Sequence, residues 1–217
     1  MKHKNAPELI PEEYLARAKK LNAAQLADGM KELGVYRDGV MDADILPVER
    51  HMKMVGTAFT VETADGDNFP IHVATYTGGD GYVMVIDGKG HSEHAYLGDL
   101  IMGAAKAVGY CGIVCDGYVR DREGCIEMNF PVYSRGLMQR GPIKKNPGKI
   151  NEPIVCGGIR VEPGDLVVGD YDGITVVPRA LIPEVLERAE KKQAYEEKRD
   201  EMIANYVAAK AAGREAC

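Results

Sequence analysis

The chain has 217 residues, of which 45% are hydrophobic and 28% are charged, and its formal net charge is −6. This acidic balance argues against a nucleic-acid backbone as the main partner, since phosphate binding needs a basic face. No apolar run approaches the roughly 20 residues of a membrane span, and the N-terminal residues lack the apolar core of a signal peptide. We therefore expect a soluble, cytoplasmic protein that binds neither nucleic acid nor membrane.

The five cysteines are an odd number and are scattered along the chain. Cys111 and Cys115 are separated by three residues, which is not the spacing of a zinc-ribbon pair. We expect all five to be small buried hydrophobic residues in a reducing compartment, without a disulfide framework or a nucleophilic thiol. They are Cys111, Cys115, Cys125, Cys156 and Cys217.

The N-terminal third alternates helical and strand patterns. Asn22 is a good N-cap for a helix from residue 23 to about residue 33, and Gly34 follows as a stop. The run at 83–86 is short and apolar, as in a buried strand. The expected elements are helices at 11–20 and 23–33, a strand at 55–62, a short helix from Asp67, a strand at 83–86 and a flexible loop at 87–91.

The middle of the chain reads as a helix, a strand and an exposed charged turn. From Gly98 the apolar residues recur at helical spacing, and Gly109 stands where a left-handed C-cap would. The apolar run at 112–115 predicts a buried strand, and the residues at 116–121 follow as a charged turn. The apolar stripe of the helix is Leu100, Ile101, Ala104, Ala105 and Val108.

The C-terminal half predicts several strands and one long helix. The helix at about 180–211 would measure about 45 Å, longer than a compact domain of this size is wide. Its charged middle and the apolar residues from Met202 to Val207 predict docking on a neighbouring subunit. The expected strands lie at 131–134, 153–156, 158–161, 166–168 and 174–177, and a surface connection spans 135–150. Without any internal repeat, the pattern indicates one α/β domain.

The segment from Gly98 to Asp121 carries the strongest chemistry. The first turn of a helix has unpaired N–H groups and a partial positive charge, so it can hold a carboxylate. Arg120 offers a planar fork for a second carboxylate or keto oxygen, and Asp121 is a hard oxygen ligand suited to Mg²⁺ or Mn²⁺. Each feature alone is common, and it is their joint occurrence that suggests a site.

This segment resembles the RraA-like family, which includes metal-dependent 4-hydroxy-4-methyl-2-oxoglutarate/4-carboxy-4-hydroxy-2-oxoadipate aldolases. The family has an acidic residue twenty-one positions before the Arg of an Arg-Asp pair, and Asp99 and Arg120 have that separation. The runs at 56–61, 66–68 and 163–173 agree with the family, and the similarity extends from about Asn22 to about Glu190. The resemblance implies a layered ββα fold of the swivelling type, with N-terminal helices at 11–34, a core at 55–178 and the C-terminal helix in one domain at 1–217. It also implies a homotrimer or homohexamer with active sites at subunit boundaries.

The resemblance also implies roles for individual residues. Asp121 would bind Mg²⁺ or Mn²⁺, and Arg120 would stabilise the negative charge of a pyruvate enolate. The backbone N–H groups of Leu100 and Ile101 would hold the carboxylate of a 2-oxo acid, with Gly98 permitting close approach. Asp99 would orient a water that carries protons. The reaction would be retro-aldol cleavage of a 4-hydroxy-2-oxo (di)carboxylic acid to pyruvate, with oxaloacetate decarboxylation alongside.

One position departs from the family pattern. An acid often stands three residues after the Asp of the Arg-Asp pair, but here that position is Gly124, with Glu123 one place earlier.

Four further possibilities concern residues or functions outside this core. A regulator of the RraA type would bind and inhibit a ribonuclease without catalysis. A Schiff-base aldolase would need a desolvated lysine, and Lys89 lies between two glycines. His91 and His94 could line the distal end of the substrate, and acids of the last helix could reach a neighbouring subunit's site. Those acids are Glu196 and Glu197.

Overall fold

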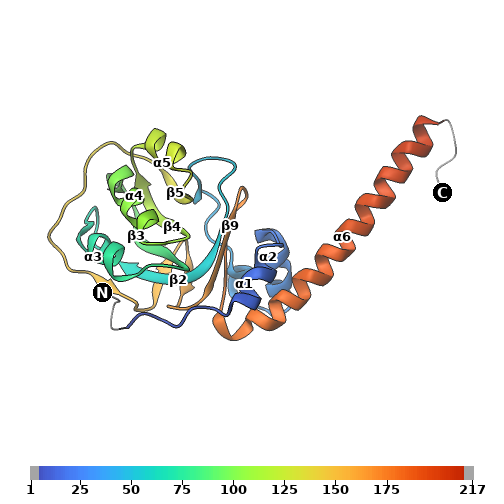
Figure 1. Cartoon of the computed structure of the whole chain (residues 1–217), viewed down its shortest axis with the longest axis horizontal. Coiled ribbons are helices and arrows are strands. Elements are labelled where there is room, and N and C mark those ends of the chain that lie inside the picture. The colour runs from blue at the N-terminus through green and yellow to red at the C-terminus, as the bar shows by residue number, and fades with distance from the viewer. Residues whose placement is uncertain (1–4, 213–217) are drawn as a thin grey trace.

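The computed structural model describes residues 5–212 and is organised around one eight-stranded sheet (Figure 1). The strand order is β1-β5-β4-β3-β2-β9-β10, with β6 paired to β2. The strands of this sheet are β1 (Leu46–Pro47), β2 (Met54–Glu62), β3 (Tyr82–Leu97), β4 (Gly112–Val119), β5 (Val132–Leu137), β6 (Lys149–Ile150), β9 (Leu166–Asp170) and β10 (Gly173–Val177). A separate hairpin pairs β7 (Ile154–Cys156) with β8 (Ile159–Val161).

The centre of the sheet is parallel. Strands β2, β3, β4 and β5 run in one direction and are joined by the helices α3 (Phe69–Thr77), α4 (Asp99–Ala107) and α5 (Arg122–Met128). Because side chains alternate between the two faces of a strand, Met84 packs on the side of these helices while Val83 packs against the β7–β8 hairpin. All three connecting helices therefore cover one face of the sheet, and the carboxyl ends of the parallel strands meet at one edge.

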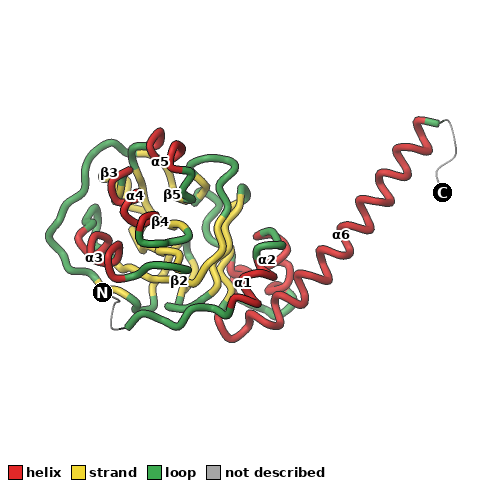
Figure 2. The backbone as a smooth tube through the Cα atoms, viewed as in Figure 1, coloured by secondary structure: helices red, strands yellow, loops and turns green. Residues whose placement is uncertain are grey.

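A second group of helices packs at the β9–β10 end of the sheet, as Figure 2 shows. It contains α1 (Glu12–Ala18), α2 (Ala23–Lys31) and the first turns of α6 (Ile182–Ala211), and two 3₁₀ turns lie at Tyr36–Gly39 and Arg179–Leu181. Asn22 caps α2 as predicted, since its side chain accepts from the N–H of Gln25 at 2.7 Å and the Gln25 side chain accepts from the Asn22 N–H at 3.0 Å.

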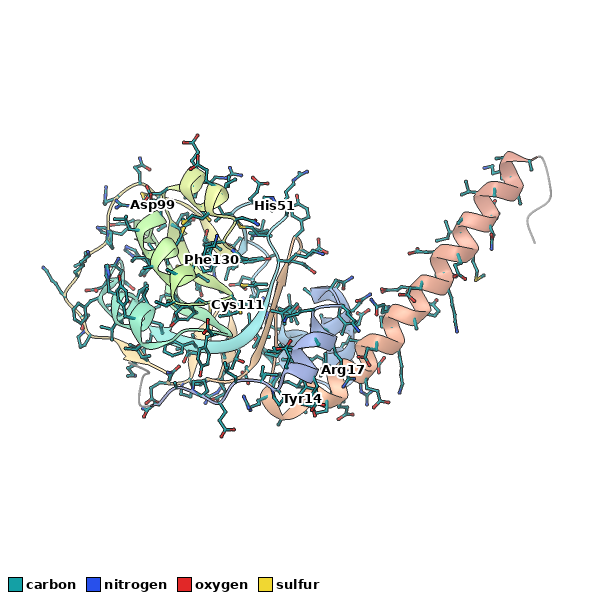
Figure 3. All side chains as sticks on the ribbon, in the orientation of Figure 1. Tyr14, Arg17, His51, Asp99, Cys111 and Phe130 are labelled. Carbon is teal, nitrogen blue, oxygen red and sulfur yellow. The ribbon has the colours of Figure 1, made fainter. Side chains whose placement is uncertain are left out.

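The long final helix has the predicted extent and projects away from the body (Figures 1 and 3). Its first half is anchored through buried residues between Ile182 and Ala189, an ion pair from Arg17 to Glu190 at 2.7 Å and a hydrogen bond from Gln25 to Glu196 at 2.7 Å. The outer part exposes large apolar side chains to solvent: Tyr195, Met202, Ile203, Tyr206 and Val207.

Two predictions about the central strands were wrong. The expected loop at 87–91 belongs to β3, a strand of 16 residues. Left-handed backbone at Lys89 (φ 56°) and Gly90 (φ 67°) accommodates a shift of register against β4, so the strand continues past this point. The expected charged turn from residue 116 is still β4. Asp116 is only 5% exposed and its charge is paired with Arg135, which also binds Asp42.

The described part of the chain contains no helix long and apolar enough to cross a membrane. Its four cysteines are unpaired thiols, and Cys115, Cys125 and Cys156 are buried. Burial raises the pKa of Cys125 to about 11, which keeps this thiol protonated and unreactive. Cys217 lies outside the described residues.

Candidate active site

The predicted site residues lie where two neighbouring parallel strands end. Strand β3 ends at Leu97 and Gly98 starts α4, while β4 ends at Val119 and is followed by Arg120. Leu97 and Val119 are paired in register, and the N–H of Arg120 donates to the carbonyl of Leu97 at 3.0 Å. The carboxyl edge of a parallel sheet is the usual place for a ligand in such folds.

A pocket of about 110 Å³ opens at this edge. It brings together all six residues of the site expected between Gly98 and Asp121, which come from the start of α4 and from the end of β4, and it adds residues from the start of α3 and from the 142–144 segment. The lining residues are Asn68, His72, Leu97, Gly98, Asp99, Leu100, Ile101, Arg120, Asp121, Pro142 and Lys144.

The backbone of Asp121 is held in an unusual conformation. Its φ of 60° and ψ of 46° place it in the left-handed region, which costs a non-glycine residue on the order of 1–3 kcal/mol. Its Oδ2 lies 3.3 Å from the backbone N of Asp99 and 3.4 Å from Nε of Arg120. A Cβ on Gly98 would overlap this oxygen, so glycine is required for the carboxylate to sit against the start of α4.

A divalent cation fits this arrangement if water or substrate oxygens supply most of its ligands. Among residues 5–212 no three His, Cys, Asp or Glu side chains converge on a common point, so a cage made wholly of protein ligands is excluded there. The Asp121 side chain is 39% exposed and presents hard oxygens to the pocket. Mg²⁺ binds through one or two carboxylates while keeping water or substrate oxygens as its other ligands, and this donor set suits such an ion.

The first turn of α4 differs from the prediction in two ways. The N–H of Ile101 donates to the Gly98 carbonyl at 3.1 Å, and the N–H of Asp99 is directed to Asp121, so Leu100 N–H is the candidate donor to a ligand carboxylate. The Leu100 side chain is 83% exposed instead of belonging to the apolar stripe. The buried side of α4 is formed by Ile101, Met102 and Ala105.

Sequence reasoning missed three polar residues of the pocket: Asn68, His72 and Lys144. Asn68 is 2% exposed, and neither its Oδ1 nor Nε2 of His72 has a hydrogen-bond partner among the described residues. Burial lowers the pKa of His72, and the nearby charge of Lys144 lowers it further. The available signal was a pair of polar residues four positions apart at the start of a helix whose other residues up to Ala74 are apolar.

Asp67 explains how the distant 144 segment reaches the pocket. Its Oδ2 accepts from the N–H groups of Lys145 at 2.8 Å and Asn146 at 2.9 Å, and its Oδ1 accepts from the Phe69 N–H at 2.9 Å. Burial raises the pKa of Asp67, but these three N–H donors outweigh it and hold the pKa below its ordinary value. One carboxylate thus ties the start of α3 to the loop that carries Lys144.

Four of the other suggested residues lie elsewhere. His91 and His94 stack on each other with their nitrogens 3.1 Å apart and do not line this pocket, and their contact with the distal end of the substrate stays a prediction. Lys89 also lies outside it, 3.9 Å from Glu62. The side chain of Glu196 accepts from Gln25 at 2.7 Å.

The last suggested acids are not part of the pocket either. Glu196 and Glu197 both belong to α6, which leaves the body on the side away from Asp99 (Figure 3). Glu123 lies in the exposed first turn of α5. Gly124 faces the site instead, since a Cβ there would come within 3.0 Å of the Asp99 Cβ. The acid that often occupies this position in the family would therefore lie beside Asp99.

Comparisons with known proteins agree with this geometry. The chain is 42% identical over 169 residues to a protein of Halalkalibacterium halodurans named "Putative 4-hydroxy-4-methyl-2-oxoglutarate aldolase". The aligned region covers 78% of this chain and 80% of the relative. A protein of the same name from Shewanella oneidensis is 36% identical over 126 residues, covering 58% of this chain and 76% of the relative.

Solved structures share the fold. RraAS2 of Streptomyces coelicolor, described as an unusual member of the RNase ES inhibitor RraA protein family, has a TM-score of 0.81 at 25% identity and covers 89% of this chain and 98% of its own. A protein from Pseudomonas syringae pv. tomato has a TM-score of 0.75 at 27% identity, covering 96% and 97%. These likenesses confirm the expected layered α/β fold with its long C-terminal helix. A family model described as RraA-like, Aldolase/RraA, matches residues 23–176, so the protein belongs to the RraA-like family.

Proposed function

We propose that the protein is a divalent-metal-dependent lyase that cleaves a 4-hydroxy-2-oxo (di)carboxylic acid to pyruvate by a retro-aldol reaction and also decarboxylates oxaloacetate. One observation carries the proposal: the Arg120 guanidinium and the Asp121 carboxylate line one small pocket at the start of α4. Two relatives named as aldolases support the same reaction class.

Both reactions pass through the enolate of pyruvate, whose negative charge the site must stabilise. A bound Mg²⁺ or Mn²⁺ on Asp121 would supply electrophilic stabilisation of that charge. Arg120 directs its guanidinium to the keto oxygen, where a preorganised donor is typically worth about 3 kcal/mol of the barrier. Leu100 N–H holds the substrate carboxylate with the positive end of the helix dipole, and Asp99 orients a water for proton transfer.

Lys144 indicates that the substrate carries a second acidic group. It lines the same pocket as Arg120 and Asp121, yet its segment is far from both in sequence. A single ammonium at the pocket wall attracts a distal carboxylate more strongly than an uncharged substituent. We therefore expect a 4-hydroxy-2-oxo dicarboxylic acid to be cleaved faster than the corresponding monocarboxylic acid.

Pyruvate release from 4-hydroxy-4-methyl-2-oxoglutarate, coupled to lactate dehydrogenase, tests the proposal. The activity should be lost with EDTA and return with Mg²⁺ or Mn²⁺. It should fall at least about 100-fold in Arg120→Lys, since one preorganised donor is worth that much, and should be lost in Asp121→Asn, which removes the charged ligand of the metal. His51→Gln, an exposed histidine outside the pocket, is the control. Activity that survives EDTA, or inactivation by borohydride in the presence of pyruvate, would instead indicate a lysine Schiff base, for which Lys144 is the candidate.

A second function is favoured by the structural neighbours. The Streptomyces coelicolor protein is described as an unusual member of the RNase ES inhibitor RraA protein family, and a Thermus thermophilus protein (TM-score 0.60, 25% identity) is described as the RNA-processing inhibitor RraA. If Arg120→Lys and Asp121→Asn leave turnover unchanged while the chain inhibits a purified ribonuclease E, the regulatory function replaces the lyase.

We further propose that the protein assembles as a homotrimer or homohexamer through the outer part of α6. That part exposes Met202, Ile203 and Tyr206 by more than half of their surface, and it lies beyond Glu196, whose side chain still accepts a hydrogen bond from Gln25. An exposed apolar stripe on a projecting helix is typical of a surface that contacts another copy.

A further inference from the structure

The segment between β5 and β6 brings one charged side chain to the pocket. Residues 138–148 belong to no helix or strand apart from an isolated bridge at Ile143, and Lys144 is exposed and lines the pocket. A lysine side chain is a flexible four-carbon stem, so in an unconstrained loop its ammonium would occupy many positions. A localised charge at the pocket wall therefore requires that the backbone on both sides of Lys144 be held.

Backbone pairing holds the residue before Lys144. The N–H of Ile143 donates to the carbonyl of Gly66 at 2.7 Å, and the N–H of Asn68 donates to the carbonyl of Ile143 at 2.9 Å. Asp67 and Ile143 thereby form an isolated parallel bridge. The upstream side of Lys144 is tied to the start of α3 by main-chain contacts that do not depend on any side chain.

The Asp67 carboxylate holds the two residues after Lys144. Its Oδ2 accepts from the N–H groups of Lys145 and Asn146, at 2.8 and 2.9 Å, while its Oδ1 accepts from the N–H of Phe69. Asp67 is only 3% exposed, and all three contacts need an acceptor. An asparagine has one amide oxygen and one donor NH₂ group, so it cannot satisfy both sides of this arrangement.

The charge of Lys144 acts on the pocket, whereas Asp67 does not reach it. Burial lowers the pKa of His72, and the charge of Lys144 lowers it further, which places the ammonium near the α3 wall. Asp67 is not among the residues that line the pocket. Any effect of Asp67 on a ligand at this wall must therefore pass through the segment that it holds.

The part of the segment next to Arg120 is held separately. The N–H of Ala95 donates to the carbonyl of Arg140 at 2.8 Å, and a Cβ on Gly141 would lie 3.4 Å from Nη1 of Arg120. Neither contact involves Asp67. Loss of the Asp67 contacts should therefore release Lys144 and leave the surroundings of Arg120 in place.

We propose that Asp67 is a positioning residue for substrate specificity, because its bonds to the backbone after Lys144 hold the Lys144 ammonium where it binds the distal carboxylate of a dicarboxylic 2-oxo acid. Without these bonds Lys144 is held on one side only, its ammonium spreads over many positions, and the site no longer distinguishes dicarboxylic from monocarboxylic acids. This inference rests on the proposed function and assigns the residue that sets its preference for a second acidic group.

A binding measurement tests the inference without turnover. Calorimetry with magnesium present compares 2-oxoglutarate with 2-oxopentanoate, which has a methyl group in place of the distal carboxylate. The wild type should bind 2-oxoglutarate about 10-fold more tightly, the size of one charge-assisted hydrogen bond, and Asp67→Asn should abolish that preference. Asp65→Asn, at an exposed acid outside the pocket two residues earlier, is the matched control and should retain it. A preference that survives in folded Asp67→Asn would overturn the inference.

A double-mutant cycle shows whether Asp67 acts through Lys144. Asp67→Asn and Lys144→Met should each lower kcat/KM for 4-hydroxy-4-methyl-2-oxoglutarate about 10-fold, mainly through KM, and change that for 4-hydroxy-4-methyl-2-oxopentanoate less than two-fold. The double variant should also lose about 10-fold, because Asp67→Asn has already displaced Lys144; independent effects would multiply to about 100-fold. Multiplied losses, or equal losses on both acids, would overturn the inference. A wild type that releases pyruvate from neither acid would overturn the proposed function, and calorimetry would still decide the inference.

Hydrogen exchange on the wild type needs no variant to fold. The amides of Lys145 and Asn146 should exchange at least about 10-fold more slowly than the same amides in an unstructured peptide, because the Asp67 carboxylate accepts from both. Unprotected exchange at both amides would overturn the inference even if Asp67→Asn does not fold.

Discussion

Replacing Gly98 by alanine is the sharpest structural test of the site. Gly98 has φ −138° and ψ −167°, extended backbone that alanine adopts easily, so the substitution adds one methyl group without backbone strain. That methyl group would overlap Oδ2 of Asp121 and lie 3.0 Å from Cγ of Arg120. The two side chains proposed for catalysis must therefore both move.

The expected loss is large for activity and small for stability. Displacing a preorganised electrostatic group costs roughly 3 kcal/mol of barrier, which is a factor of about 100 in kcat/KM. The Asp121 and Arg120 side chains are 39% and 41% exposed, so both can swing into solvent without leaving a buried charge. The change in the free energy of unfolding should stay below about 1 kcal/mol, as for an ordinary surface substitution.

Gly103→Ala on the same helix is the matched control. Its Cβ would come no closer than 3.4 Å to Sδ of Met128, and alanine favours a helix interior over glycine by about 1 kcal/mol. This variant should be equally or more stable and fully active. Pyruvate release and urea unfolding on both proteins decide the question. Full activity in Gly98→Ala would refute the placement of the Asp121 carboxylate against the start of α4.

The remaining predictions concern stability and assembly. Arg135→Met leaves Asp116, 5% exposed, as an unpaired buried charge, and should cost about 3–5 kcal/mol by urea unfolding; a loss below 1 kcal/mol would contradict the pairing. Hydrogen bonds from Arg135 hold the pKa of Asp42 below its ordinary 3.8, so its carboxylate stabilises the fold above pH 3.8 and loses this effect as the pH falls further. Asp42→Asn should therefore be less stable than the wild type at pH 7 and equal to it near pH 2, and a stability gap that does not change with pH would disprove this. Ile203→Glu, at a side chain 54% exposed, should reduce the mass measured by light scattering to that of a monomer without changing the unfolding midpoint of a single chain; an unchanged mass would exclude α6 as the contact.

Local patterns predicted the elements well where the causes are local. The capping residue Asn22, the apolar run at 83–86 and the turn at Gly109 (φ 98°) each depend on neighbours within a few positions. The extent of β4 could not be read in this way. Asp116 remains in a buried strand because Arg135, nineteen residues later, pairs with its charge and the N–H of Gly157 donates to its other oxygen.

The residues of the candidate site also divide into those indicated by local motifs and those brought to the pocket by tertiary contacts. Gly98, Asp99, Arg120 and Asp121 belong to two compact motifs, and the resemblance of these motifs to the RraA-like family indicated them. Lys144 reaches the pocket through backbone hydrogen bonds to Asp67, and such a tertiary contact leaves no local pattern. The polar pair on α3 was visible in the sequence, but only its orphaned atoms distinguish it from ordinary helix residues.

A structure of the protein with magnesium and oxalate, a stable mimic of the pyruvate enolate, tests the central claim most directly. The account predicts an ion on the Asp121 carboxylate and oxalate oxygens within hydrogen-bond distance of the Arg120 guanidinium and the Leu100 N–H. Oxalate bound elsewhere, with both side chains turned away from it, would contradict the account.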